Sequence, residues 1–330
     1  MRTRDAIEEL KAGVLSGDRA VLGRALTLVE SNSPDHRQRG QQLLAALLPE
    51  TGGAQRIGIT GVPGVGKSTF IETFGLRLIE RGHRVAVLAG DPSSSVSKGS
   101  ILGDKTRMED LSRNDLAFIR PSPAGGSLGG VARKTRESIL VCEAAGFDIV
   151  LVETVGVGQS ETTVADMVDF FLLLKLAGAG DELQGIKRGI LELADLIAIN
   201  KADGDNLVPA ERARIEFERA LHILRPARDD QWMPRVVTSS AVTGDGIDEI
   251  YDLIVEHREF LESVGAFETR RSTQQLHWMW ALVEEGLRAA VREHPGVVGR
   301  IEDLERAVVG GRITASAAAE EILGAFRGDR

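Results

Sequence analysis

Apolar residues follow two alternating patterns from Gln55 onward. Short apolar runs bounded by polar or glycine residues alternate with longer segments in which apolar residues recur every three or four positions. This alternation is typical of an α/β fold with a mostly parallel sheet flanked by helices. Strands are predicted at 56–60, 84–89, 116–120, 148–153, 168–174, 195–199 and 235–239.

Both ends of the chain show helical periodicity without strand-like runs. The sequence predicts an N-terminal helical extension (1–53), a central α/β domain (54–265) and a C-terminal helical region (266–330). Gly52 and Gly53 lie at the first junction, as expected of a linker. The N-terminal helices are expected either to cap the sheet or to form a partner-binding surface.

Helices in the C-terminal region are predicted at 276–287 and 297–326, with Gly310 and Gly311 interrupting the second stretch. Trp278, Met279 and Trp280 lie in the first of these helices. We expect them to be packing residues, and exposure at a subunit interface is the alternative.

One glycine-rich segment follows the first predicted strand and precedes an amphipathic stretch from Phe70 to Ile79. It fits the phosphate-binding pattern G-x-x-x-x-G-K-[ST] and consists of Gly61, Val62, Pro63, Gly64, Val65, Gly66, Lys67, Ser68 and Thr69. Glycines allow backbone N–H groups to surround phosphate oxygens, and the following helix directs its positive dipole end at the same anion. Lys67 is predicted to neutralise the β- and γ-phosphates, and the Ser68 hydroxyl to ligate Mg²⁺.

Polar segments after two other predicted strands lie where ligands gather in a parallel sheet. Asp91 opens a long Ser- and Gly-rich loop that contains Asp104, and both carboxylates are candidate Mg²⁺ ligands. Asp91 is also a candidate catalytic residue.

The predicted strand 148–153 ends in Glu153, a candidate Mg²⁺ ligand and catalytic residue. Gly156 offers a backbone N–H to the terminal phosphate and a hinge that can move when that phosphate leaves. Gln159 or Glu161 is predicted to orient the attacking water. Farther along, the charged loop 175–188 is either a solvated loop or a mobile one that brings catalytic Lys187 or Asp181 toward the nucleotide or a partner.

A second motif, N-K-x-D, ends the predicted strand 195–199 and consists of Asn200, Lys201, Ala202 and Asp203. The Asp203 carboxylate can accept hydrogen bonds from both N1–H and N2–H₂ of guanine, whereas adenine has a lone pair at N1. Asn200 is expected to brace the loop and the base, and the Lys201 stem to lie along the base. Ser239, Ser240 and Ala241, after the last strand, match the short element that supports guanine recognition. The predicted nucleotide is GTP, with GDP as product.

Composition narrows the class of protein. The 330 residues are 42% hydrophobic but only 4% aromatic, so aliphatic side chains must fill the core. A net charge of −9 argues against broad contact with nucleic acid or an anionic membrane. Cys142 is the only cysteine, which excludes disulfides within the chain and cysteine-rich metal sites. Without an apolar signal region or a bilayer-length apolar run, a cytoplasmic protein is expected.

The phosphate loop, D-P-S-S-S at 91–95, E-T-V-G-V-G-Q-S-E at 153–161 and the later N-K-A-D together resemble the MeaB/ArgK family of GTPases, also named LAO/AO transport system kinases. Members of this family are chaperones of adenosylcobalamin-dependent methylmalonyl-CoA mutase and related acyl-CoA mutases, and the similarity extends over essentially the whole chain. It implies a P-loop NTPase of the SIMIBI type, the class that also contains the metal-delivery GTPases.

The resemblance also implies slow GTP hydrolysis, nucleotide-gated loading of the cofactor, and protection or rescue of the mutase. A homodimer joined largely through the C-terminal helices is expected. By the same resemblance, Asp181, Gln184 and Lys187 belong to a switch loop that couples the nucleotide to the partner.

Two other functions fit a phosphate-binding loop. A metal-delivery GTPase usually carries a cysteine cluster or a histidine-rich tract, but here Cys142 stands alone and the 6 histidines are scattered. A P-loop kinase is disfavoured by the N-K-A-D motif and by the lack of a recognisable acceptor-binding element.

Overall fold

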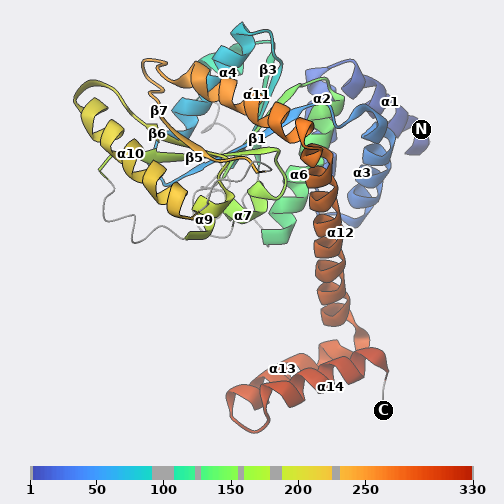
Figure 1. Cartoon of the computed structure of the whole chain (residues 1–330). Coiled ribbons are helices and arrows are strands. Elements are labelled where there is room, and N and C mark those ends of the chain that lie inside the picture. Colours follow the sequence, from blue (N-terminus) through green and yellow to red (C-terminus); the bar gives the residue numbers. More distant parts are fainter. Residues whose placement is uncertain are drawn as a thin grey trace. The chain divides into compact units, whose positions relative to one another are not determined.

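A computed structural model describes residues 3–90, 108–122, 128–154, 160–178, 188–224 and 231–328 (Figure 1). The chain divides into two units, Met1–Arg271 and Ser272–Arg330. None of the helices in the described ranges is long and apolar enough to cross a membrane.

A seven-stranded parallel sheet with the order β3-β2-β4-β1-β5-β6-β7 forms the centre of the first unit. Its strands are β1 (Gln55–Gly61), β2 (Val85–Gly90), β3 (Ala117–Ser122), β4 (Ile149–Glu153), β5 (Phe170–Leu176), β6 (Leu196–Asn200) and β7 (Arg235–Thr238). All seven predicted strands are confirmed, with ends shifted by no more than two residues. The strands after β1 lie on both sides of it, which makes its carboxyl end the expected ligand crevice.

Helices cover both faces of the sheet (Figure 1). One face carries α4 (Lys67–Glu80), α5 (Glu109–Arg113) and α11 (Ile247–Ser263), and the other carries α6 (Leu128–Ala144), α7 (Ser160–Ala165), α9 (Arg188–Leu193) and α10 (Leu207–Leu224). Successive strand residues point to opposite faces. Leu172 and Leu174 therefore pack in one core with Phe70, while Leu173 packs in the other core with Phe217.

Three N-terminal helices, α1 (Thr3–Leu15), α2 (Arg19–Val29) and α3 (Pro34–Leu47), precede a short 3-10 helix, η1 (Leu48–Glu50). They pack on one another and on α6. The Asp18 carboxylate caps α2 by accepting from the N–H groups of Ala20 and Val21. At the other end of α2, Glu30 accepts hydrogen bonds from Arg120 of β3. The N-terminal helices thus cap the sheet, largely through α6.

The second unit contains α12 from residue 272 onward, α13 (Pro295–Val309) and α14 (Ala315–Arg327). The last two helices pack on each other, and the His294 ring lies 5.2 Å from that of Phe326. Gly311, with φ of +66°, lies in the turn between them. Met279 and Trp280 of α12 are 45% and 60% exposed, so the prediction that they are packing residues is wrong within one chain. They belong to an apolar face of the helix that the described part of the chain leaves exposed to solvent.

Two consecutive arginines fix the beginning of α12 (Ala266–Glu293) to the amino-terminal edge of the sheet. Arg271 donates to both carboxylate oxygens of Asp169 at 2.7 Å. Arg270 donates to Asp195 at 3.0 Å. The two aspartates directly precede β5 and β6, and both are buried. A buried carboxylate is tolerated only when a cation and further donors compensate its lost hydration.

We expect Arg271→Met to lower the free energy of unfolding by about 3–5 kcal/mol, because it leaves the buried Asp169 carboxylate without its cation. The control is Arg113→Met, since Arg113 forms an exposed pair with Glu109 and its loss should cost at most about 1 kcal/mol. Urea unfolding followed by circular dichroism measures both variants. Equal losses in the two variants would show that the Arg271–Asp169 pair does not anchor α12.

Candidate nucleotide site

The loop Gly61–Thr69 connects the carboxyl end of β1 to the first turn of α4. Gly64 and Gly66 have φ angles of +83° and +94°, which glycine adopts without strain. A Cβ atom on Gly66 would lie 3.0 Å from Nδ2 of Asn200. The first turn of a helix has N–H groups without intrahelical acceptors, so the start of α4 suits an anion.

Lys67 folds back over this loop, where its Nζ donates to the Gly61 carbonyl at 2.8 Å. Burial lowers the pKa of Lys67, and the negative charges of Glu153 and Glu161 act in the opposite direction. These two carboxylates come from the end of β4 and from α7. The predicted phosphate-binding lysine therefore interacts electrostatically with Glu153 and with Glu161, and Glu161 is one of the two candidates for orienting the attacking water.

Asn200 and Lys201 hold the phosphate loop from the end of β6. Asn200 Nδ2 donates to the Val65 carbonyl at 2.8 Å, and Lys201 Nζ donates to the Gly64 carbonyl at 2.8 Å. Lys201 has φ of +61° and is the one non-glycine residue with positive φ in the described part of the chain. Such a backbone costs on the order of 1 kcal/mol and persists where surrounding contacts fix it.

Asp203 is held by the segment after β7. Ser240 Oγ donates to Asp203 Oδ2 at 2.6 Å and accepts from the N–H groups of Val242 and Thr243 at 3.3 and 3.2 Å. The Ala202 N–H donates to the Ser239 carbonyl at 2.9 Å. These bonds orient the carboxylate predicted to read guanine.

The helix after the phosphate loop contacts the same segment, because Thr73 Oγ1 of α4 donates to the Ala241 carbonyl at 2.7 Å. Residues 61–69, 200–203 and 239–241 are therefore one hydrogen-bonded unit.

Ser68 lies in the first turn of α4, and Glu153 ends β4, the strand beside β1. Both side chains supply hard oxygen donors, which fits Mg²⁺. No three His, Cys, Asp or Glu side chains within the described ranges gather into a metal-binding cluster. From the described residues, a magnesium ion here would draw on the Ser68 hydroxyl group and the Glu153 carboxylate, together with phosphate oxygens and water.

A pair of buried hydroxyl groups was missed from the sequence. Thr154 Oγ1 donates to Thr60 Oγ1 at 2.8 Å, just below the phosphate loop. This bond continues the register in which Ile59 pairs with Glu153 and ties the end of β4 to the end of β1. The sequence does place a threonine at the end of each of these two predicted strands. It does not show that the two strands pair, and this pairing is what brings the threonines together.

Several predicted residues lie outside the described part of the chain: Asp91, Asp104, Gly156, Gln159, Asp181, Gln184 and Lys187. Their roles in metal binding, catalysis and switching stay predictions.

The chain is similar in sequence to known GTPases, as its phosphate-loop and N-K-A-D motifs predict. Residues 22–296 match the family model described as methylmalonyl Co-A mutase-associated GTPase MeaB. A putative GTPase of Caulobacter vibrioides is 59% identical over 97% of this chain and 98% of its own length. GTPase ArgK of Escherichia coli is 55% identical over 82% of this chain and 81% of its own.

The chain is also similar to a mitochondrial protein and to a protein of known crystal structure. The mitochondrial methylmalonic aciduria type A homolog of Mus musculus is 47% identical over 97% of this chain and 80% of its own. The crystal structure of a LAO/AO transport system kinase matches with a TM-score of 0.80 and 40% identity over 99% of both chains.

Gly66→Ala should weaken GDP binding at least about tenfold, because it combines a strained φ with a Cβ atom pressed against Asn200. Gly23→Ala in α2 is the control, since its Cβ would meet no atom within 4 Å. Isothermal titration with GDP measures both affinities. If the two variants bind GDP equally well, the close approach of Gly66 to Asn200 does not shape the site.

Proposed function

The chain belongs to the MeaB family of methylmalonyl-CoA mutase-associated GTPases, and we propose that its GTP cycle gates adenosylcobalamin loading into an acyl-CoA mutase and protects or reactivates that enzyme. The proposed client is methylmalonyl-CoA mutase, the enzyme that the family description names. The observation that carries the proposal is the direct bonding of the N-K-A-D loop to the phosphate loop, in a chain that matches this family over residues 22–296.

In the proposed reaction, water attacks the γ-phosphate in line with the departing GDP oxygen. Lys67 and the N–H groups of the phosphate loop stabilise the charge that develops on the phosphate oxygens. Ser68 and Glu153 would hold Mg²⁺, together with Asp91 and Asp104, and the ion would neutralise phosphate charge. Asp203 selects guanine, and Ser240 keeps its carboxylate oriented.

The signal to the mutase is proposed to leave through the loops at 91–104, 153–161 and 175–188. Glu153, whose charge acts on Lys67, is the first residue of the middle loop, so a change at the γ-phosphate acts directly on that loop. Gly156 is proposed to sense the γ-phosphate, and either Gln159 or Glu161 to position the water. Asp181, Gln184 and Lys187 are proposed to couple the nucleotide to the partner.

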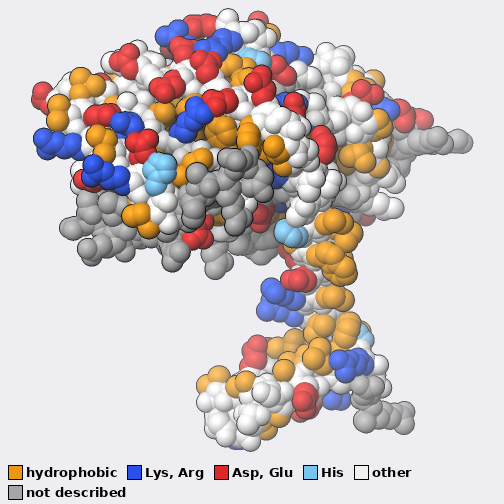
Figure 2. All heavy atoms as spheres, viewed as in Figure 1, with side chains coloured by type: hydrophobic (Ala, Val, Ile, Leu, Met, Phe, Trp, Pro, Cys, Tyr) orange, Lys and Arg blue, Asp and Glu red, His pale blue; other side chains and the backbone are white. Residues whose placement is uncertain are grey.

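A homodimer through the C-terminal helices is part of the proposal. Figure 2 shows exposed hydrophobic side chains gathered along α12. Four of them, Leu276, Trp280, Val283 and Leu287, are spaced by four, three and four residues and are 58%, 60%, 41% and 55% exposed. Side chains at this spacing form one stripe along a helix, which favours burial against a second copy.

Asp203→Asn tests the nucleotide and the partner together. The amide can donate to the additional carbonyl of xanthine but cannot accept both guanine donors, so preference should shift from GTP to XTP by about 100-fold. Hydrolysis of both nucleotides is measured alongside cofactor loading of purified methylmalonyl-CoA mutase, and loading should follow XTP. Asp205→Asn, two residues away, is the control and should keep GTP preference.

Two results would contradict this account in different ways. Unchanged GTP preference in Asp203→Asn would refute the guanine assignment. XTP hydrolysis without any effect on the mutase would support the GTPase but refute the chaperone role.

Trp280→Glu should convert a dimer into a monomer, because it places a charge in the centre of the apolar stripe. Ala289→Glu adds the same charge to the opposite side of α12 and should leave the dimer intact. Sedimentation velocity at micromolar concentrations measures the mass of each variant. A Trp280→Glu protein that remains dimeric would exclude this stripe as the interface.

A further inference from the structure

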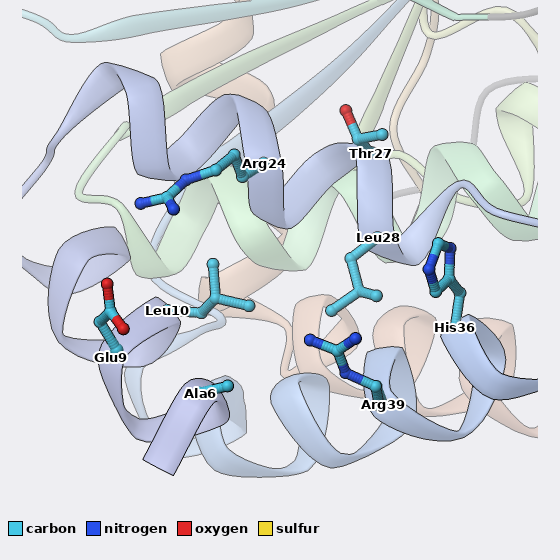
Figure 3. A pocket seen from close by; sticks show the side chains of 8 residues that line it. All are labelled: Ala6, Glu9, Leu10, Arg24, Thr27, Leu28, His36 and Arg39. Carbon is cyan, nitrogen blue, oxygen red and sulfur yellow. The ribbon is translucent and has the colours of Figure 1, made fainter. Parts of the chain in front are cut away.

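A cavity of about 320 Å³ lies among the three N-terminal helices, and no residue of 61–69, 200–203 or 239–241 lines it (Figure 3). Figure 3 shows the side chains of Leu10, Leu28 and Arg39 converging between these helices. Glu9 and Arg24 lie toward one end of the cavity. Its volume is at the lower limit of typical small-molecule sites, which are mostly apolar with a few polar groups.

Two arginines line this cavity, of which Arg24 is exposed to solvent and Arg39 is half-buried. Among the described residues, Arg24 and Arg39 make no hydrogen bond or ion pair, whereas arginines elsewhere in the chain, such as Arg56 and Arg214, pair with glutamates. Arg39 Nε is buried and has no acceptor. A buried donor without an acceptor lowers stability, and a bound acceptor would recover that loss.

The charge balance indicates which anion would fit. Arg24 and Arg39 contribute two positive charges and Glu9 one negative charge, while His36 is bonded to Ser31 Oγ through Nδ1 at 2.9 Å. The arginine and glutamate side chains of the lining therefore sum to a net positive charge of one, which matches a monoanion. The planar fork of a guanidinium group suits a carboxylate, and apolar lining residues offer surface to the rest of the molecule.

We propose that this cavity binds a small organic carboxylate, with its head group on Arg39 and its apolar body against Leu10 and Leu28. The inference concerns a second site and does not depend on the proposed GTPase function. A ligand bound there would bridge α1, α2 and α3, and α2 and α3 pack on α6 of the nucleotide-binding unit.

The test is isothermal titration of the full chain with hexanoate, with and without saturating GDP. We expect one hexanoate per chain with a dissociation constant of about 1 mM or below, unaffected by GDP. Hexan-1-ol, which lacks the charge, and inorganic phosphate, which lacks the apolar body, should each bind at least about tenfold more weakly.

Three single substitutions test whether hexanoate binds in this cavity. Arg39→Met should weaken hexanoate binding at least about tenfold without lowering the unliganded melting temperature, because it removes an unpaired buried N–H. Arg37→Met is the matched control, since it makes the same change on α3 at a position outside the cavity lining and should bind as the parent does. Ala6→Phe fills the cavity and should abolish binding.

Three results with hexanoate would overturn the proposal. These are absence of saturable hexanoate binding to the parent chain, equal affinities of the Arg37 and Arg39 variants, and binding that survives in Ala6→Phe. Phosphate or hexan-1-ol binding as tightly as hexanoate would also overturn it, because the site would then not recognise an amphipathic carboxylate.

Discussion

The nucleotide site depends on two hydrogen bonds that cross the carboxyl edge of the sheet. Asn200 and Lys201, at the end of β6, donate to the carbonyl groups of Val65 and Gly64 in the loop after β1. Because β5 lies between these strands, the bonds reach over its end. The loop that is proposed to read the base therefore also fixes the backbone that is predicted to surround the phosphates. This shared support places Asn200 Nδ2 3.0 Å from the position that a Cβ atom on Gly66 would take.

The same strands connect this edge to the anchor of α12. Asp195 and Asn200 lie at opposite ends of β6, and Asp195 pairs with Arg270. Asp169, before β5, pairs with Arg271 and also accepts from the Arg56 N–H of β1 at 2.9 Å. Two buried carboxylates thus join the first turns of α12 to the strands that support the phosphate and base loops. The helix with the proposed dimer stripe begins at this anchor.

Much of this arrangement follows from local sequence patterns. Short apolar runs and helical periodicity predicted every strand of the described sheet, because each run is buried between helices on both faces. The phosphate loop was recognisable because its motif places glycine where the backbone needs positive φ, as at Gly64 and Gly66. The two motifs could be expected to meet because both follow strand ends.

Contacts between distant segments were not predictable in the same way. The Thr60–Thr154 bond depends on the insertion of β4 beside β1, which local periodicity does not encode. The positive φ of Lys201 arises from tertiary contacts that override the residue's own preference. The sequence pattern around Met279 and Trp280 fits a packed helix as well as it fits an exposed one. The two side chains are exposed because no element in the described part of one chain covers them.

The claim that Asn200 supports the phosphate loop is tested most directly with a ligand that has no base. Tripolyphosphate binding in the presence of Mg²⁺ is measured by isothermal titration for the parent chain and Asn200→Ala. Loss of the bond to the Val65 carbonyl should weaken tripolyphosphate binding about tenfold, although no base is present to be recognised. An Asn200→Ala protein that binds GTP weakly but tripolyphosphate as tightly as the parent would contradict the account.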